Sequence, residues 1–245
     1  MGRGLAGPAA GVASSAPIAH LNLRRTDWRA PALVLVLVGL VALGWVLGLV
    51  ARHALSLPVD RPVLRLIVQH RAGWLTSLML AVTNLGAPAL LLVVIVGLGW
   101  AWWTWRRTSL PLVMLLAAWL GAEVLFNVAK LLVDRPRPPI ASSVQHFGGL
   151  AFPSGHATQA AAVWGMVAVL AVMSMATRPT KTAVCAAAIT IVVVVGLTRV
   201  YLGAHWTTDV LGGWFLGGAW TAAVVCFIGP GDRLEPDVPV ADTTV

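Results

Sequence analysis

Charged side chains are scarce in this sequence. Only 11% of its 245 residues are Asp, Glu, Lys or Arg, whereas an average soluble domain carries roughly 25%. So few charges cannot cover a water-facing surface, which excludes a soluble enzyme. The hydrophobic content of 58% also excludes a disordered or fibrous chain, apart from the two ends.

Cysteine is almost absent as well. The two cysteines, Cys185 and Cys226, both lie in apolar runs, which excludes a disulfide framework and a cysteine-based metal site. Residues 1–23 lack the apolar core of a signal peptide. We expect residues 1–29 to form a disordered cytoplasmic tail and residues 230–245 a second cytoplasmic tail.

Long stretches without charge dominate the remainder, residues 30–229, which we predict to be one membrane domain. A span needs about 20 apolar residues. The charge-free stretch Ala72–Trp105 is too long for one helix, and the segment 84–88 interrupts it. We therefore predict an all-α integral membrane bundle of six transmembrane helices, with an extracytoplasmic interfacial helix over roughly 60–84. The predicted spans are Ala30–Ala51, Pro88–Trp105, Thr108–Ala129, Ala157–Thr177, Thr182–Thr198 and Val210–Gly231.

The net charge of +8 does not indicate a nucleic-acid partner, because the basic residues lie between apolar runs and form no continuous basic face. With both termini inside, nine of the 17 Lys and Arg residues fall on the inner side and eight outside. Setting aside three cations that have a role described below leaves five outside. This bias favours cytoplasmic termini in a plasma membrane.

Two further patterns concern the membrane and the helix contacts. The tryptophans between Trp100 and Trp105, followed by Arg106-Arg107, are typical of an aromatic belt. The pairs Gly212-Gly213 and Gly217-Gly218 predict close helix packing, either within the chain or in a homodimer.

Three polar clusters interrupt the apolar pattern, and the predicted topology places all of them on the outer face. One runs from Lys130 to Arg137-Pro138 after the third span, and another is Pro153–His156 before the fourth. The last begins at Thr198-Arg199 and continues to His205 and Asp209. The converging cations Lys130, Arg137 and Arg199 suit a phosphate group.

The remaining residues of these clusters suit phosphoryl transfer. Ser154-Gly155 precedes a helix, whose free backbone N–H groups favour an anion. Asp209 lies four residues after His205 and is expected to fix its tautomer, which leaves the other ring nitrogen as a nucleophile. His156 is then available as the general acid. These histidines and Asp209 also suit a metal ion, but the crowd of cations argues against one, and we expect no metal and no cofactor.

The patterns K-x6-RP, PSGH and [S/T]R-x5-H-x3-D resemble those of the type 2 phosphatidic acid phosphatase (PAP2) family, which shares its site with vanadium-dependent haloperoxidases and bacterial acid phosphatases. The resemblance covers roughly residues 60–228 and departs from the usual Ser only at Thr198. It implies that His205 forms a phosphohistidine, that Asp209 orients it, and that His156 protonates the leaving group. The phosphate-binding residues it implies are Lys130, Arg137, Ser154, Gly155 and Arg199. Arg135-Pro136 repeats the Arg-Pro pair two residues earlier, and the K-x6 spacing selects Arg137.

Two positions stay open. Glu123 lies within a span, on nearly the same helical face as Asn127 and Lys130. It either positions Lys130 or lines a headgroup pocket, or it makes an interhelical hydrogen bond as a protonated acid. His146 lies in the active-site hairpin, where contact with substrate is the less favoured interpretation.

The sequence thus predicts a multi-pass bacterial membrane phosphatase acting on a lipid phosphate at the extracytoplasmic face. The resemblance implies polyprenyl diphosphate, phosphatidylglycerol phosphate or phosphatidate as substrate. We favour the polyprenyl carrier, although no residue selects it. A lipid phosphotransferase using the same site, or a non-catalytic lipid transport or assembly protein, are the alternatives; a haloperoxidase would need vanadate.

Overall fold

The computed structural model describes residues 31–36, 38–40, 42 and 58–228, and this part of the chain is helical with no strand. Five of its helices are long and apolar enough to cross a membrane. They are α4 (Pro88–Arg106), α5 (Leu110–Val133), α6 (Gly155–Ser174), α7 (Arg178–Tyr201) and α8 (Thr207–Ile228). These correspond in order to the last five predicted spans. The described residues of the first predicted span, Ala30–Ala51, are helical, but most of that span and both tails lie outside the described residues.

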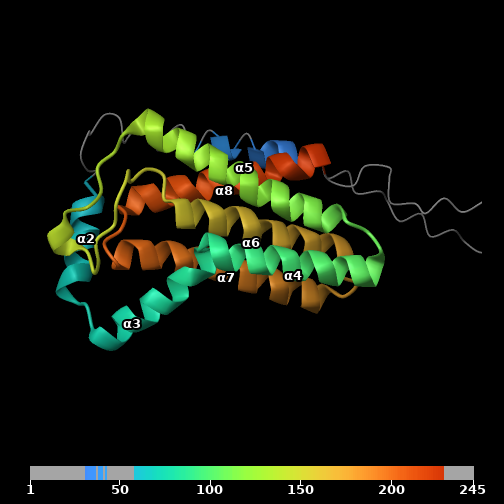
Figure 1. Ribbon diagram of the computed structural model, residues 1–245, viewed down its shortest axis with the longest axis horizontal. Helices are drawn as coiled ribbons and strands as arrows, with labels where there is room; N and C mark the ends of the chain where they lie inside the picture. Colours follow the sequence, from blue (N-terminus) through green and yellow to red (C-terminus); the bar gives the residue numbers. More distant parts are fainter. Residues whose placement is uncertain (1–30, 37, 41, 43–57, 229–245) are drawn as a thin grey trace, which may run out of the picture.

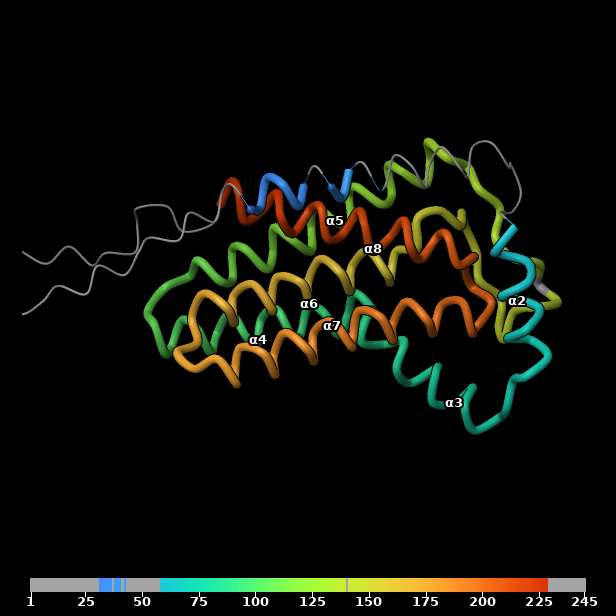
Figure 2. The backbone as a smooth tube through the Cα atoms, turned by 180° about the vertical axis from the view of Figure 1, so that it is seen from behind, coloured from blue at the N-terminus to red at the C-terminus, as the bar shows by residue number. Residues whose placement is uncertain are grey.

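The five long helices form a bundle in which α6 lies at the centre, packed against α5, α7 and α8 (Figures 1 and 2). Pro88 begins α4 at a position where proline needs no hydrogen-bond donor. The core between the helices is built from apolar side chains, among them Leu91, Met114 and Val163. Large apolar side chains such as Val93, Leu131 and Phe227 are exposed on the outside of the bundle, as expected for a surface that faces lipid.

The glycine pairs of α8 serve packing within the chain. A Cβ added to Gly213 would lie 2.8 Å from the carbonyl oxygen of Ser154, and one added to Gly217 would lie 2.8 Å from the Cβ of Ala161. Gly212 lies against Phe152 in the same way, whereas Gly218 has no such neighbour within 4 Å. Three of the four glycines therefore let α8 approach α6 and the loop before it.

The segment before α4 is not the single helix that we predicted over 60–84. It forms two helices, α2 (Asp60–Gln69) and α3 (Gly73–Val82), followed by the 3₁₀ turn η1 (Thr83–Gly86). Ala72 is extended, with φ −120° and ψ 142°, and separates the two helices. Beside it, the guanidinium of Arg71 donates to the carbonyl oxygens of Tyr201 at 2.6 Å and Ser142 at 2.8 Å. The α2 and α3 helices lie at one end of the bundle (Figure 1).

Candidate active site

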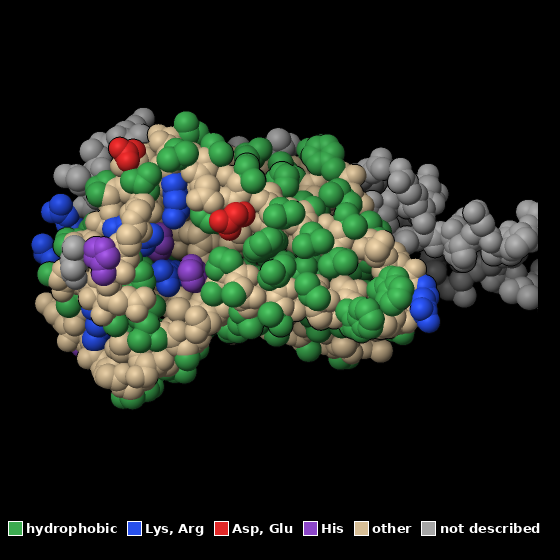
Figure 3. Space-filling view, viewed as in Figure 1, with side chains coloured by type: hydrophobic (Ala, Val, Ile, Leu, Met, Phe, Trp, Pro, Cys, Tyr) green, Lys and Arg blue, Asp and Glu red, His purple; other side chains and the backbone are tan. Residues whose placement is uncertain are grey.

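The two hairpins that carry the polar clusters meet at the end of the bundle where α2 lies. One is the loop 134–154 between α5 and α6, which contains the short turn η2 (Ile140–Ser142), and the other is the turn 202–206 between α7 and α8. The backbone N–H of Val144 donates to the carbonyl oxygen of Leu202 at 3.0 Å and joins them. Basic and histidine side chains gather around a hollow at this end, while hydrophobic side chains cover the side of the bundle (Figure 3).

The residues from Arg199 to His205 form a hydrogen-bonded turn at the C-terminal end of α7. The carbonyl oxygen of Arg199 accepts hydrogen bonds from the backbone N–H groups of Ala204 at 3.0 Å and His205 at 3.3 Å. Gly203 makes this turn possible because its φ of 71° lies in the left-handed region. A Cβ there would also lie 2.9 Å from Cα of Ser143. The five residues between Arg199 and His205 thus form the last residues of α7 and the turn that follows it.

The environment of His205 defines which of its nitrogens is free to react. Its ring is buried, and Nδ1 lies 2.8 Å from the carbonyl oxygen of Ala151. Because a carbonyl oxygen only accepts, Nδ1 carries the proton and Nε2 of the neutral ring has the lone pair. Nη1 of Arg137 lies 3.3 Å from Nε2. Burial lowers the pKa of His205 well below its ordinary value, and the positive charges of Arg137, Arg199 and Lys130 lower it further, which favours the neutral ring.

Asp209 does not hold His205 in the direct way that the four-residue spacing suggested. Its Oδ2 lies 3.6 Å from Nδ1, beyond hydrogen-bond distance, and accepts instead from the backbone N–H of Trp206 at 2.8 Å. Its Oδ1 is bound by Nη1 of Arg135. The proton on Nδ1 is therefore bound by the main-chain carbonyl of Ala151, and the Asp209 carboxylate lies near Nδ1 without a hydrogen bond to it.

The two Arg-Pro pairs have different surroundings. Arg137 faces His205, and its guanidinium donates to the carbonyl oxygens of Ala204 at 2.8 Å and Gly149 at 3.0 Å. Burial lowers the pKa of Arg137, while Asp209 acts in the opposite sense. Arg135 is buried and faces Asp209 and Asp60 instead. Of these two arginines, Arg137, which the K-x6 spacing selects, is therefore the one beside the His205 ring.

The other two cations come from transmembrane helices. Nη1 of Arg199 donates to Oγ1 of Thr83 on η1 at 3.0 Å, and its guanidinium lies 5.1 Å from the ring centre of Phe147. Nζ of Lys130 lies 5.3 Å from the ring centre of Phe126. Sequence reasoning missed Thr83, since only the fold brings η1 to the end of α7.

Ser154, Gly155 and His156 form the start of α6. Ser154 is the N-cap residue, but its hydroxyl makes no capping hydrogen bond. Its Oγ and the Nε of Arg199 are buried and have no hydrogen-bond partner among the described residues. Such groups are costly to bury unless a ligand satisfies them. Gly155 packs against Phe126, and His156 remains partly exposed, so the site is accessible beside His156.

Glu123 makes an interhelical contact one helical turn beyond His156. Its Oε2 accepts from Nε2 of Gln159 on α6 at 2.7 Å, and its Oε1 accepts from Nδ2 of Asn127 at 3.1 Å. The ammonium group of Lys130 lies over the ring of Phe126 and forms no ion pair with Glu123. The contacts agree with the interhelical hydrogen-bond interpretation, although here the carboxyl group accepts twice. His146 is exposed on the loop.

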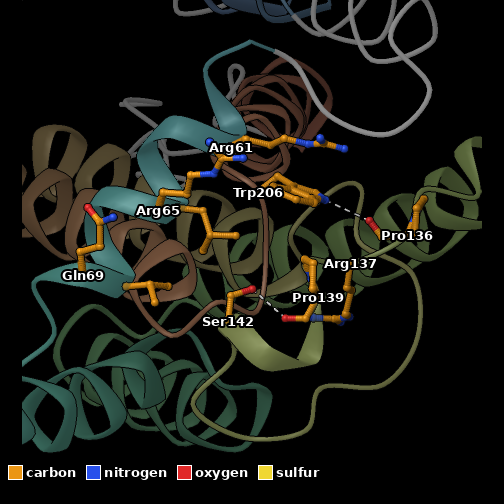
Figure 4. A pocket seen from close by; sticks show the side chains of 10 residues that line it. Arg61, Arg65, Gln69, Pro136, Arg137, Pro139, Ser142 and Trp206 are labelled. Atoms are coloured by element: carbon orange, nitrogen blue, oxygen red, sulfur yellow. Dashed lines mark hydrogen bonds between the residues drawn. The ribbon is translucent and has the colours of Figure 1, made fainter.

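Arg137 also lines a cavity of about 640 Å³ (Figure 4). Arg61 and Arg65 of α2 line one wall, and Trp206 lies between them and the loop that carries Arg137. Nε1 of Trp206 donates to the carbonyl oxygen of Pro136 at 3.0 Å. The described residues contain no group of three or more His, Cys, Asp or Glu side chains placed to hold a metal ion.

Comparison with known proteins identifies the family of this chain. The family model of the PAP2 superfamily matches residues 108–231. Phosphatidylglycerophosphatase B of Bacillus subtilis (strain 168) is 39% identical over 160 residues, which cover 64% of this chain and 77% of that protein.

Two solved structures have the same fold. The crystal structure of the first transmembrane PAP2 type phosphatidylglycerolphosphate phosphatase from Bacillus subtilis matches with a TM-score of 0.67 and 32% identity, over 79% of this chain and 93% of that one. Aquifex aeolicus LpxE matches with a TM-score of 0.56 and 20% identity, over 69% of this chain and 96% of that one, which is a likeness of fold. The family model and the Bacillus relatives together establish that this chain is a multi-pass membrane protein of the PAP2 superfamily and a lipid phosphatase of that type.

Proposed function

We propose that this enzyme hydrolyses the terminal phosphomonoester of phosphatidylglycerol phosphate through a phosphohistidine on His205. The observation that carries the proposal is the hydrogen bond from Nδ1 of His205 to the carbonyl oxygen of Ala151, which leaves the Nε2 lone pair beside Arg137. The names of the two Bacillus relatives support this substrate over polyprenyl diphosphate and phosphatidate.

The first step is attack of Nε2 of His205 on phosphorus. A P–N bond forms, the P–O bond to the headgroup glycerol breaks, and the leaving oxygen takes a proton from His156. Arg137, Arg199 and Lys130 balance the charge that the phosphoryl oxygens carry in the transition state. The unpaired Ser154 hydroxyl and the backbone N–H groups at the start of α6 complete the phosphate site.

The second step returns the enzyme to its starting state. Water attacks phosphorus, now-neutral His156 accepts a proton from it, and the P–N bond breaks. Inorganic phosphate leaves and His205 regains its lone pair. None of these steps calls on a metal ion, and the cations take the role that a metal has in other phosphatases.

The orientation of the membrane domain is part of the proposal. The cytoplasmic excess of Lys and Arg supports an active site on the extracytoplasmic face, with both tails inside. The clusters lie at helix ends, which supports a reaction at the depth of the lipid headgroups. This depth suits a substrate whose acyl chains remain in the bilayer. A single cysteine introduced into the loop 134–154 is expected to react with an impermeant thiol reagent added to intact cells, in a background that lacks Cys185 and Cys226.

Phosphate release from purified lipid substrates tests the reaction. In detergent micelles containing EDTA, we expect the highest kcat/KM on phosphatidylglycerol phosphate, lower values on phosphatidate and polyprenyl diphosphate, and none with His205→Ala. A radiolabelled terminal phosphate is expected to remain on the wild-type protein after rapid acid-free quenching, and not on His205→Ala. Full activity of His205→Ala would refute the covalent route. Strict dependence on added metal would refute the metal-free one, and transfer of phosphate to an added alcohol in place of water would identify a phosphotransferase.

A further inference from the structure

A buried polar network lies behind His205 and joins three segments that are far apart in the sequence. Asp60 comes from α2, Arg135 from the loop after α5, and Thr208 and Asp209 from the start of α8. All four are buried, and Asp60 and Asp209 have exposures of 1% and 0%. Asp60 lies outside the three patterns that carry the proposed reaction, and Arg135 and Thr208 occupy positions within two of them where the pattern specifies no residue type.

Asp60 binds the start of α8 from outside that helix. Its Oδ1 accepts from the backbone N–H of Thr208 at 3.0 Å, and its Oδ2 accepts from the Thr208 hydroxyl at 2.8 Å. The first N–H groups of a helix have no partner within it, and a carboxylate is favoured at that end. Asp60 therefore fixes the position of the helix turn that carries Asp209.

Arg135 connects Asp60 to both groups that face Nδ1 of His205. Its Nη2 donates to Oδ2 of Asp60 at 2.7 Å, while Nη1 donates to Thr208 Oγ1 at 2.8 Å and binds Oδ1 of Asp209. Its own carbonyl oxygen accepts from the backbone N–H of Ala151 at 2.8 Å. The carbonyl of Ala151 is the acceptor for the Nδ1 proton of His205.

We infer that Arg135, held by Asp60 and Thr208, is a positioning residue for the reaction of His205. It fixes the Asp209 carboxylate through its side chain and the Ala151 carbonyl through its main chain. Arg135 thus lies between the carboxyl groups of Asp60 and Asp209. When Nε2 takes the phosphoryl group in the proposed mechanism, on which this inference rests, the ring becomes cationic, and the Ala151 carbonyl oxygen that accepts the Nδ1 proton stabilises it.

A merely structural role would also make Arg135 sensitive to mutation, since it anchors α2. Arg71 provides the matched control. It ties the same segment to the fold through the carbonyl oxygens of Tyr201 and Ser142, and it makes no hydrogen bond with Asp209 or His205. Loss of either arginine weakens the attachment of α2, but only loss of Arg135 removes the group that fixes Asp209.

The test compares Arg135→Met, Asp209→Asn, their double variant and Arg71→Met as full-length proteins in detergent, on phosphatidylglycerol phosphate. Arg135→Met is expected to lower kcat by about 100-fold with little change in KM. The double variant is expected to lose no more than the worse of its single variants, because both changes remove one interaction. Arg71→Met is expected to lower the Tm while keeping kcat. Equal loss of kcat in Arg71→Met and Arg135→Met, or multiplied losses in the double variant, would overturn the inference.

Thr208 keeps the test decisive if Arg135→Met does not fold. Thr208→Val preserves the shape of the side chain and removes the hydroxyl that links Arg135 to Asp60, so kcat is expected to fall about tenfold. Thr208→Ser is expected to restore kcat. Wild-type kcat in Thr208→Val refutes the inference. Failure of the wild-type protein to hydrolyse any lipid phosphate refutes the proposed function instead.

Discussion

Nη1 of Arg137 and Nε2 of His205 lie 3.3 Å apart, on the side of the imidazole opposite to its hydrogen bond with Ala151. The guanidinium thus occupies the approach to the ring nitrogen that carries the lone pair. A phosphate group bound by Arg137 would have its phosphorus near that nitrogen. The same contact disfavours a proton on His205.

The pH dependence of kcat/KM is the first consequence. Since the pKa of His205 lies well below its ordinary value, the nucleophile of the free enzyme is neutral at the pH where an ordinary histidine titrates and is protonated only at lower pH. We expect kcat/KM to show no acidic limb near 6.5 that belongs to the enzyme. The profile is measured with two substrates whose phosphate groups ionise at different pH, because an enzyme limb does not move between them. A common limb at or above 6.5 that moves to higher pH in Arg137→Met would contradict the expectation, because loss of that cation raises the pKa of His205.

Removal of His156 is expected to affect substrates unequally. If His156 protonates the leaving oxygen, His156→Ala slows the cleavage of a glycerol phosphate ester by about 100-fold or more. An aryl phosphate has a leaving group that needs no proton, so its cleavage to the phosphohistidine is expected to change far less. Single-turnover release of the alcohol or phenol measures this step. The same proportional loss for both substrates would argue against the general-acid role.

Glu123 is expected to matter for folding more than for chemistry. Glu123→Gln keeps a hydrogen bond with Gln159 in either orientation of the Gln159 amide. The buried Oε1 of Gln159 has no partner among the described residues, and after rotation of that amide it can accept from the new side chain. Glu123→Leu leaves the Gln159 amide with only its 3.3 Å contact to the carbonyl of Trp119, at a cost of about 1 kcal/mol. We expect Glu123→Gln to retain kcat across the pH range and Glu123→Leu to lower the Tm. A pH-dependent loss of kcat in Glu123→Gln would indicate a direct role in proton transfer.

The two glycines Gly217 and Gly218 offer a matched pair for helix packing. Alanine at Gly217 would place its Cβ 2.8 Å from the Cβ of Ala161 and 3.1 Å from the backbone nitrogen of Ala162, whereas alanine at Gly218 meets nothing within 4 Å. Gly217→Ala is therefore expected to destabilise the fold by about 1–3 kcal/mol. Gly218→Ala is expected to change stability by less than about 0.5 kcal/mol. Unfolding in detergent measures both, and equal effects would argue against close α6–α8 packing through Gly217.

The order of the long helices followed from the sequence, but their ends did not. The third and fifth predicted spans end at Ala129 and Thr198, next to the cations Lys130 and Arg199. The helices continue to Val133 and Tyr201. A charged side chain marks where the apolar stretch ends, while the backbone hydrogen bonds of the helix continue past it.

The sequence by itself determined the residue types on which the proposed chemistry depends. Apolar stretches of membrane-spanning length, cations suited to phosphate, and two histidines in fixed spacings are local properties of the chain. The tertiary structure alone decided which groups fix His205. A carbonyl such as that of Ala151 has no sequence signature, and Arg135 meets Asp60 and Asp209 only because loops distant in the chain fold together. The four-residue spacing places Asp209 near His205. Its two carboxyl oxygens nevertheless bind the backbone N–H of Trp206 and the guanidinium of Arg135 in place of the imidazole.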